Sequence, residues 1–550
     1  MRVVIVGGVA GGASAAARLR RLDEHCEIVM IKRGAHISFA NCGLPYFVGG
    51  EIEQRQALLL QTPQSFHQRF RVDVRVNAEV MRVDRAQKEV EVRDLPTGQT
   101  YSLSYDKLIL SPGALPIYPH VEGAEHCEFF TLRNIPDAER ISEAATQRHA
   151  RHALVVGAGF IGVEITENLC RRGVATTLVD LADHVMPNLD ADIAMELALH
   201  IKQKGVDMRT STAIQRIEWG ESGNIVTLTD GSTVTPDIIV LCIGVRPDSR
   251  LAKQAGLALG VKDAIVVDEH MRTSDPDIYA VGDAVQVRDF VTQMDVHVPL
   301  ASPANKQGRI AADHICGRKA VYRATQGTAI AKVFDMTAAS TGASERTLRA
   351  AGIAYESTYT FSAAHATYYP GATSMAIKLL FAPQDGKLLG AQLCGYEGVD
   401  KRCDVLATAI RAGMTVYDLT ELELAYAPPF SSAKDPVNMA GYVAENALEG
   451  LVKPFSIDEI DGLDVEKISF VDVRTPGEYR HGTILNAINL PLDEIREHLD
   501  ELDPQKPVYL FCQVGLRGYI AARILMQRGF DVYNLKGGYR LYSVQEALKG

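Results

Sequence analysis

The chain has 550 residues, which at ~150 residues a domain predicts three to four domains. Hydrophobic residues make up 47% of it and charged residues 23%, a composition that excludes a disordered, collagen-like or coiled-coil protein. The formal net charge of −11 argues against broad binding to nucleic acid or to an anionic membrane. Because no apolar run reaches the ~18–20 residues of a membrane span and the N-terminus lacks a signal-peptide pattern, we expect a cytoplasmic protein.

The first 31 residues predict a nucleotide-binding unit. A buried strand over residues 3–6 runs into a glycine-rich turn, which is followed by a helix at Ala13–Leu22 and a strand at Glu27–Ile31. This order is Rossmann-like, because such a turn lets a pyrophosphate approach the N–H groups at the start of the helix. The turn departs from the usual fingerprint, since a valine replaces the second glycine and a lysine stands near the place of the ribose-binding acid. The candidate residues are Gly7, Val9, Ala10, Gly11, Gly12, Lys32 and Arg33.

A second unit between Ala153 and Asp180 carries a cleaner fingerprint, Gly-Ala-Gly-Phe-Ile-Gly, between a predicted strand and helix. Asp180 ends the next strand, where a carboxylate accepts hydrogen bonds from both ribose hydroxyls and repels a 2′-phosphate. The unit therefore predicts binding of NADH in preference to NADPH, although NADPH stays possible. The candidate residues are Gly157, Gly159, Phe160, Ile161, Gly162, Glu164 and Asp180.

Later segments extend this organisation. Hydrophobic strands that end in glycine lie at 108–113 and 238–244, and residues 278–283 end in Val-Gly-Asp. The aspartate that ends the last of these segments, Asp283, is suited to bind the ribitol chain of a flavin. The alternative is an ordinary turn aspartate. Alternating strands and helices from about 325 to 445 form a third region. Residues 446–464 are predicted as a linker, and the remainder as a separate small α/β domain.

The two dinucleotide units, the Ile-Tyr-Ala-Val-Gly-Asp segment and a cysteine near position 40 resemble the pyridine nucleotide-disulfide oxidoreductase superfamily. The resemblance implies an α/β flavoprotein with two Rossmann-like domains and an α+β dimerisation domain. The implied boundaries are an FAD domain at 1–112 and 246–325, an NAD(H) domain at 113–245 and a dimerisation domain at 326–445. Further cofactor contacts that it implies are Asn41, Val80, Ser111, Gly113, Gly244, Gly282, Asp283, Pro299, Leu300 and Ala301.

One of the nine cysteines, Cys42, stands in the segment Ser-Phe-Ala-Asn-Cys-Gly-Leu-Pro-Tyr. Glutathione-reductase-like members carry two cysteines there, spaced C-x-x-x-x-C, whereas this chain has one. Its oxidised form must then be a mixed disulfide, a sulfenic acid or a persulfide, unless it is merely a small buried side chain. Since the thiolate is the reactive form, we expect a helix N-terminus and nearby cations to lower the pKa of Cys42.

Single-cysteine members include NADH oxidases, NADH peroxidases and coenzyme A-disulfide reductases, and the segment around Cys42 resembles the last group. The peroxidases carry a histidine in the first glycine-rich turn, which this chain lacks. The resemblance implies a coenzyme A site in which arginines on one face of the first helix bind phosphates, unless that face is simply solvated. The implied contacts are Ser14, Arg18, Arg21, Ser38, Asn41, Asn305, Tyr368 and Lys434, with Arg71 or Arg69 in place of a family lysine that aligns with Phe70.

Two tyrosine-containing segments, 365–371 and 424–429, lie in the third region. In the family such tyrosines reach across a homodimer to the partner's active cysteine, where a phenol donates a hydrogen bond or a proton to a departing thiolate. The resemblance implies catalytic roles for Tyr426 and for one of Tyr368 and Tyr369, with Tyr369 preferred. Packing in a core or an interface is the alternative.

The C-terminal domain, 465–550, contains a strand at 508–511 followed by Cys512-Gln513-Val514-Gly515-Leu516-Arg517. Such a loop wraps N–H groups around one sulfur and stabilises a thiolate or a persulfide, and Arg517 adds positive charge. With the segments 472–478 and 535–539 it resembles a rhodanese domain. An inactive rhodanese-like module and a relative of dual-specificity phosphatases are the alternatives, although the phosphatase arginine follows its cysteine by six residues and Arg517 follows by five.

The combination predicts that NADH, through FAD and Cys42, reduces the sulfur–sulfur bond of a persulfide, polysulfide or coenzyme A disulfide, while Cys512 transfers sulfane sulfur. Coenzyme A is expected as substrate or as a tethered carrier. We expect a homodimer with active sites shared across its interface, and no metal, nucleic acid or membrane partner. The alternatives are an NADH oxidase or peroxidase that uses a sulfenic acid on Cys42, and a sulfurtransferase with a regulatory flavin part.

Overall fold

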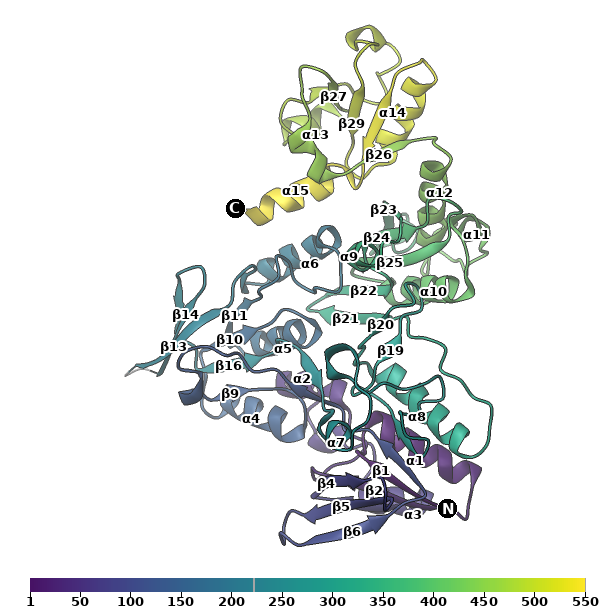
Figure 1. Cartoon of the computed structure of the whole chain (residues 1–550). Helices are drawn as coiled ribbons and strands as arrows, with labels where there is room; N and C mark the ends of the chain where they lie inside the picture. The colour runs from purple at the N-terminus through teal and green to yellow at the C-terminus, as the bar shows by residue number, and fades with distance from the viewer. Residues whose placement is uncertain (221–222, 550) are drawn as a thin grey trace. The chain divides into compact units, whose positions relative to one another are not determined.

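The computed structural model describes residues 1–220 and 223–549, so 221–222 of the predicted NAD(H) domain and the last residue of the predicted rhodanese domain lie outside it. The chain divides into two compact units (Figure 1). The first consists of Met1–Leu181 and Ser211–Gly327, and the second of Ala182–Thr210 and Thr328–Gly550. No helix among the described residues is long and apolar enough to cross a membrane.

The first unit is built on two parallel sheets of the kind that the glycine-rich turns predict. The first sheet has the order β18-β7-β1-β2-β3, and its strands carry the apolar runs that fill the core. Helices α1 and α8 pack against each other beside it. The bounds are β1 Arg2–Val6, α1 Ala10–Leu22, β2 Glu27–Lys32, α2 Leu44–Gly49, α3 Pro63–Phe70, β3 Asp73–Val76, β7 Lys107–Leu110, α7 Arg250–Gln254, β18 Ile278–Ala280, β19 Val287–Arg288, β20 Asp295–Val296 and α8 Ala301–Ile315.

The second parallel sheet of this unit contains β11, β10, β16 and β9 in that order. Helix α5 follows β10, so the second fingerprint lies at the carboxyl end of a central strand. The bounds are β9 Phe129–Phe130, α4 Ile135–Thr146, β10 His152–Val156, α5 Phe160–Arg171, β11 Ala175–Val179 and β16 Ile238–Leu241, with small antiparallel additions at β4 Ala78–Asp84, β5 Glu89–Asp94, β6 Thr100–Ser104, β8 Ala114–Pro116, β13 Ile214–Gly220, β14 Gly223–Leu228, β15 Thr233–Val234 and β17 Val245–Pro247.

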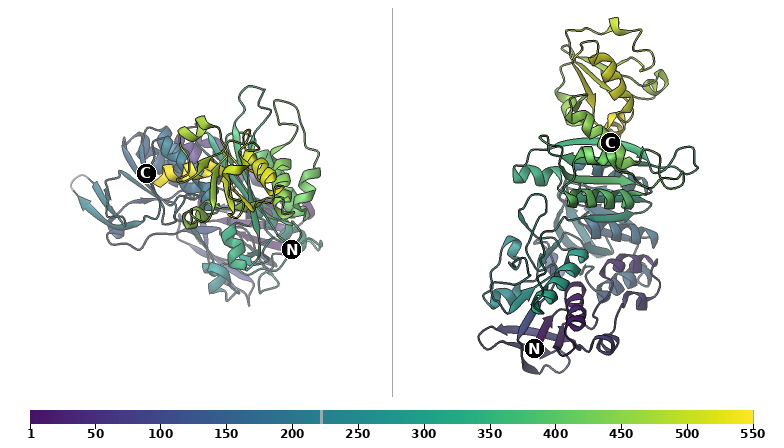
Figure 2. Two further views of the ribbon diagram at one scale, coloured as in Figure 1. Left: turned by 90° about the horizontal axis from the view of Figure 1, so that it is seen from above. Right: turned by 90° about the vertical axis from the view of Figure 1, so that its right-hand side faces the viewer.

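The second unit contains an antiparallel sheet, β21-β22-β25-β24-β23, on which α10 and α12 pack (Figure 2). The bounds are α6 Ala191–Gln203, β12 Asp207–Arg209, β21 Ala329–Val333, β22 Met336–Gly342, α9 Glu345–Ala351, β23 Glu356–Ala363, β24 Ser374–Phe381, β25 Leu388–Gly395, α10 Val399–Ala412, α11 Val416–Glu421 and α12 Pro436–Leu448.

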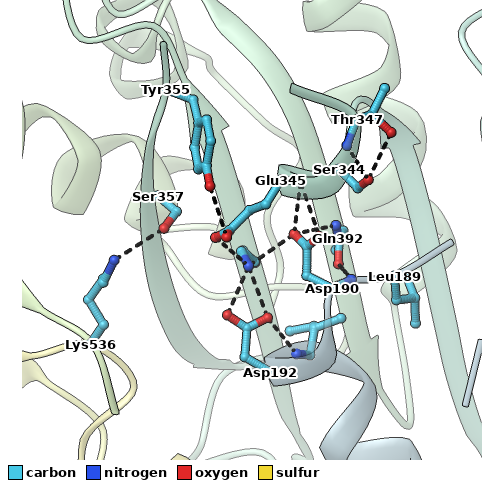
Figure 3. A network of polar contacts seen from close by, with 12 residues as sticks. Leu189, Asp190, Asp192, Ser344, Glu345, Thr347, Tyr355, Ser357, Gln392 and Lys536 are labelled. Atoms are coloured by element: carbon cyan, nitrogen blue, oxygen red, sulfur yellow. Dashed lines mark hydrogen bonds and ion pairs between the residues drawn. The ribbon is translucent and has the colours of Figure 1, made fainter. Parts of the chain in front are cut away.

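A buried ion cluster joins the antiparallel sheet to the start of α6 (Figure 3). Lys378 on β24 is completely buried, and its Nζ lies 2.8 Å from Asp192, 3.0 Å from Asp190 and 2.8 Å from Glu345. Three carboxylates around one lysine make such a buried cation tolerable, because an unpaired charge would be expelled from the interior.

The C-terminal part of the second unit is a five-stranded parallel sheet of order β26-β30-β29-β27-β28. Residues 446–464, predicted as a linker, contain regular structure: α12 ends in them and β26 pairs with β30, because the apolar Phe455 is buried there. The bounds are β26 Lys453–Phe455, β27 Ser469–Asp472, α13 Pro476–Arg480, β28 Ile488–Asn489, β29 Val508–Phe511, α14 Leu516–Met526, β30 Val532–Leu535 and α15 Gly538–Lys549.

Candidate active site

The two glycine-rich turns have the same backbone geometry. Gly7 and Gly157 both have φ +103°, and a side chain on either would collide with the backbone of a neighbouring strand end. A Cβ on Gly12 or Gly162 would lie 2.0 or 1.8 Å from the carbonyl oxygen that begins its own turn. Helix α1 therefore starts at Ala10 rather than at the predicted residue 13, since its first turn is made of glycines packed on the strand.

The second turn leaves the space that a pyrophosphate requires. A Cβ built on Gly159 meets no atom within 4 Å, and no side chain caps the N-terminus of α5. The N–H groups of this helix start are thus available to an anion. In the first turn Val9 occupies the N-cap of α1, again without a side-chain hydrogen bond. The residues at both turns fit a dinucleotide.

The predicted ribose positions differ between the turns. The Asp180 carboxylate accepts a hydrogen bond of 2.5 Å from the Ala158 N–H, which places it beside the second turn. At the first turn burial lowers the pKa of Lys32 to about 8, with help from Arg33 and Arg133. Arg33 itself reaches outward to Glu79 at 3.3 Å.

The remaining predicted cofactor contacts cluster around the ends of the first sheet. The Gly282 N–H donates to Gln307 on α8 at 2.7 Å, and Asp283 lies 3.5 Å from Arg133. Ser111 follows β7, and its Oγ would be 3.0 Å from a Cβ on Gly11. Gly113 and Gly244 have positive φ near the paired strands β8 and β17. Leu300, between Pro299 and Ala301, is the N-cap residue of α8. Val80 is buried in the core.

Cys42 lies in a short 3-10 turn, Asn41–Gly43, directly before α2, and its side chain is exposed. Although Cys42 is exposed as a residue, its sulfur is partly buried, and this burial, followed by the charges of Glu164 and Asp283, raises the pKa of the thiol. The prediction of a lowered pKa is therefore wrong for the chain alone, because burial raises the pKa and the charges that act on the thiol are carboxylates rather than cations. The side-chain oxygen of Asn41 is buried without a hydrogen-bond partner.

Glu164 on α5 is the carboxylate that dominates the surroundings of Cys42. Burial raises the pKa of Glu164 to about 7, and the Tyr46 hydroxyl donates to it at 3.4 Å. Helices α2 and α5 are held together further along, where Arg172 donates to the Val48 carbonyl at 2.8 Å. The cysteine-bearing turn and the second nucleotide turn are thus mounted on two helices in direct contact.

A cavity of about 380 Å³ opens beside α1. It brings together five of the predicted coenzyme A contacts, which are Ser14, Arg18, Arg21, Ser38 and Asn305. Ser14 Oγ donates to Asn305 at 2.6 Å, and Arg18 forms an ion pair with Asp313 at 2.7 Å. Sequence reasoning did not assign to this site five further lining residues, which are Ala13, Ala17, Gln61, Phe66 and Arg309.

Only one of the two arginines at the end of α3, Arg69 and Arg71, lines the cavity. Arg69 lines the cavity with Phe66 and Phe70, as the i, i+3, i+4 spacing of one helix face dictates. Arg71, the preferred prediction, does not line it, since it follows the helix in a left-handed conformation with φ 48°. Lys434 belongs to the second unit and is exposed there.

The predicted tyrosines lie on the surface of the second unit. The hydroxyls of Tyr368 and Tyr426 are 2.8 Å apart, so the partner of Tyr426 in this structure is Tyr368. The preferred Tyr369 instead packs edge-on against His365, with ring centroids 5.6 Å apart.

The Cys512 loop lies between β29 and α14. The sulfur is buried and accepts a hydrogen bond of 3.1 Å from the Gly515 N–H, where Gly515 has φ +106°. The loop is held from behind by α15: the N–H groups of Tyr539 and Arg540 donate to the carbonyls of Cys512 and Gln513 at 2.8 and 3.0 Å. This arrangement fixes the backbone of the loop whose Gly515 N–H points at the sulfur.

Arg517 is bound on both sides. It interacts with the Cys512 sulfur and forms a two-pronged ion pair with Glu478 on α13, at 2.6 and 2.7 Å. Its hydrogen bond to Glu478 lowers the pKa of that carboxyl to about 2. Among the described residues every cysteine is a free thiol, and no cluster of three or more His, Cys, Asp or Glu side chains could hold a metal ion.

Three family profiles match the chain. Residues 1–308 match the pyridine nucleotide-disulphide oxidoreductase family, residues 328–436 its dimerisation domain, and residues 458–545 the rhodanese-like domain. A coenzyme A disulfide reductase of Staphylococcus epidermidis is 36% identical over 447 residues, which cover 81% of this chain and all of that protein.

Solved structures extend the similarity to the whole chain. Reduced Bacillus anthracis CoADR-RHD is 50% identical with a TM-score of 0.97, covering 99% of this chain and 98% of that one. A NAD-dependent persulfide reductase from A. fulgidus is 37% identical with a TM-score of 0.93, covering 98% and 100%. The water-forming NADH oxidase of Lactobacillus brevis is 27% identical with a TM-score of 0.79, covering 82% and 99%. The chain therefore belongs to the pyridine nucleotide-disulphide oxidoreductase family, as an oxidoreductase whose cofactors are FAD and NAD(H).

Proposed function

We propose that this protein uses NADH to reduce the sulfur–sulfur bonds of thiol persulfides, polysulfide or coenzyme A disulfide at Cys42, and that Cys512 transfers sulfane sulfur. Relatives named as a coenzyme A disulfide reductase and as a NAD-dependent persulfide reductase support this substrate class. The observation that carries the proposal is the arginine-lined cavity: one of its wall residues, Ser38, lies four positions before the exposed Cys42.

In the proposed reaction the Cys42 thiolate attacks a sulfur of R–S–S–R′. A bond forms between Cys42 Sγ and RS, the S–S bond of the substrate breaks, and its electron pair leaves on R′–S⁻. When bound, FAD supplies the two-electron chemistry by which NADH restores the thiolate. Glu164, whose pKa is about 7, is able to hold a proton next to the sulfur at neutral pH and release it above.

The cavity beside α1 is the proposed site for coenzyme A. Arg21 and Arg69 are exposed and, among the described residues, form no ion pair, so their charge is available to phosphate groups. Ser14 donates its hydroxyl to the Asn305 side-chain oxygen, which leaves the Asn305 amide N–H groups as neutral donors in the same cavity.

We further propose a cytoplasmic homodimer in which Tyr426 serves the partner's Cys42. The match to the dimerisation domain supports the dimer. The hydrogen-bonded hydroxyls of Tyr368 and Tyr426 form an exposed pair of proton donors, suited to meet a departing thiolate. This pairing makes Tyr368 the second catalytic candidate in place of Tyr369.

Anaerobic NADH oxidation by the holoenzyme tests the proposal. Rates are compared for coenzyme A persulfide, coenzyme A disulfide, polysulfide and oxygen, in the native protein and in Cys42→Ser. We expect sulfur substrates to be consumed rapidly and Cys42→Ser to lose their turnover while NADH still reduces its flavin. Full persulfide turnover by Cys42→Ser would refute the role of Cys42.

An NADH oxidase is the second candidate, because the water-forming enzyme of Lactobacillus brevis shares the fold over 82% of this chain. It requires fast NADH consumption in air without any sulfur compound. A rate with oxygen that exceeds the rates with all three sulfur substrates would favour it.

A further inference from the structure

The immediate surroundings of Cys512 are electrically neutral. The side chains at 513, 514 and 516 of its loop carry no charge, and Arg517 at its end is matched by Glu478. Because the pKa of Glu478 is about 2, this carboxylate is ionised throughout the physiological range and cancels the guanidinium charge.

Two further arginines contact the loop, and each is matched in the same way. Arg474 donates to the Gln513 side chain at 3.2 Å, while its fork binds the buried Asp472 at 2.7 and 3.0 Å. Arg540 donates through its backbone to Gln513, while its fork binds Glu196 on α6 at 2.8 and 2.9 Å. Among the described residues, each arginine that contacts this loop thus forms a two-pronged pair with a carboxylate.

We propose that this pairing selects the sulfur donor: Cys512 takes sulfane sulfur from a persulfide on an uncharged carbon chain and discriminates against small sulfur dianions such as thiosulfate. The inference rests on the proposed transfer of sulfur by Cys512. A dianion that enters a buried loop loses more hydration than a persulfide does, and no uncompensated cation among the described residues contacts the loop to offset that loss. The loop supplies N–H dipoles, and the one at Gly515 already serves the sulfur.

The rim of the loop suits an uncharged chain. Leu516 belongs to the loop and Ile520 follows it one turn later on α14, and both are exposed large apolar side chains. Contact with them would remove apolar surface of the donor from water, a gain that thiosulfate cannot obtain.

The transfer balances for either donor. With a persulfide, the Cys512 thiolate attacks the outer sulfur of R–S–SH, a bond forms to that sulfur, the donor S–S bond breaks, and R–S⁻ leaves with the electron pair. With thiosulfate the same attack releases sulfite, so the two reactions form and break the same kinds of bond and differ in the charge of the donor and of the leaving group.

The test measures thiocyanate formation by the full-length holoenzyme, with cyanide as acceptor and either 2-hydroxyethyl persulfide or thiosulfate as donor. We expect kcat/KM for the persulfide to exceed that for thiosulfate by about 100-fold. Glu478→Gln leaves the charge of Arg517 uncompensated. The kcat/KM for thiosulfate, relative to that for the persulfide, should then rise by about tenfold, mainly through a lower KM, as one unpaired charge at a partly exposed site implies. This gain should vanish at high salt.

Two further variants keep the result interpretable. Leu516→Lys adds a cation at the exposed rim and leaves every ion pair intact. It should also raise kcat/KM for thiosulfate relative to that for the persulfide. Glu501→Gln makes the same change of net charge on an exposed carboxylate that is paired with His498. It should leave kcat/KM unchanged for both donors. Efficient thiosulfate use by the native protein, or no gain in both Glu478→Gln and Leu516→Lys, would overturn the inference. If Cys512→Ser retains native transfer from both donors, the proposed function of Cys512 itself fails.

Discussion

Replacing Lys378 with methionine should destabilise the second unit by about 3–5 kcal/mol, the cost of breaking a buried ion cluster by removing one partner. The lysine is completely buried, and three carboxylates surround its Nζ within 3.0 Å (Figure 3). Methionine fills most of the volume, so the loss comes from charge and not from a cavity. At ~2–4 °C per kcal/mol for a unit of this size, the melting temperature should fall by about 10 °C.

The pH dependence of this loss distinguishes the electrostatic explanation from poor packing. Without the lysine, the pKa values of Asp190 and its neighbours rise above their unfolded values of ~4, so the variant is most stable at low pH and loses stability as pH rises through the folded pKa values. The stability deficit of the variant relative to the native protein should therefore become smaller when the pH is lowered from 7 to 5.5. Asp190 should take up the first proton, because burial already raises its pKa in the native protein.

Thermal unfolding followed by circular dichroism at both pH values gives the measurement. Lys332→Met, which removes the same charge from an exposed position on β21, serves as the control and should melt with the native protein. Asp192→Asn combined with Lys378→Met should recover part of the loss, since one of the stranded carboxylates is gone. A deficit that is equal at pH 7 and pH 5.5 would contradict the reasoning.

Three other changes have definite expected results. Of the two carboxylates that raise the pKa of Cys42, Glu164 has the larger effect, so in Glu164→Gln the alkylation of Cys42 by iodoacetamide should reach its half-maximal rate at lower pH, and unchanged profiles would exclude the interaction. Asp180→Ala should raise the NADPH-to-NADH ratio of kcat/KM about tenfold, measured by steady-state kinetics, because the carboxylate that repels a 2′-phosphate is lost. Glu196→Gln breaks the fork to Arg540, so limited proteolysis should cleave the C-terminal part faster than in the native protein, whereas equal rates would deny a docking role.

The features that the sequence predicts well are those with a local physical cause. Positions 7 and 157 require glycine, because a side chain there would collide with the backbone at the end of a neighbouring strand. This requirement can be read from the turn motif itself. The sequence also held a local signal for Arg69 that the preference for Arg71 did not use, because only Arg69 shares a helix face with Phe66 and Phe70.

The features that the sequence does not predict depend on residues far apart along the chain. The pKa of Cys42 was expected to fall from its place before a helix, yet burial of the sulfur raises it, and Glu164 and Asp283 from other elements raise it further. The fork between Glu196 and Arg540 joins residues separated by 344 positions, and neither side chain lies in a motif. Such pairs exist only after folding, so charge patterns along the sequence carry no trace of them.

Ion pairing also explains why similar arginines serve opposite purposes in this protein. Arg21 and Arg69 form no ion pair among the described residues, and the cavity that they line keeps a net positive charge suited to a polyanion. Arg474 and Arg517 are each locked to a carboxylate, so they brace the Cys512 loop without making it a site for dianions. If this distinction holds, raised salt should weaken coenzyme A binding at the first site and leave persulfide transfer at Cys512 nearly unchanged. Equal salt sensitivity of the two activities would show that the carboxylates do not cancel the arginines beside the sulfur.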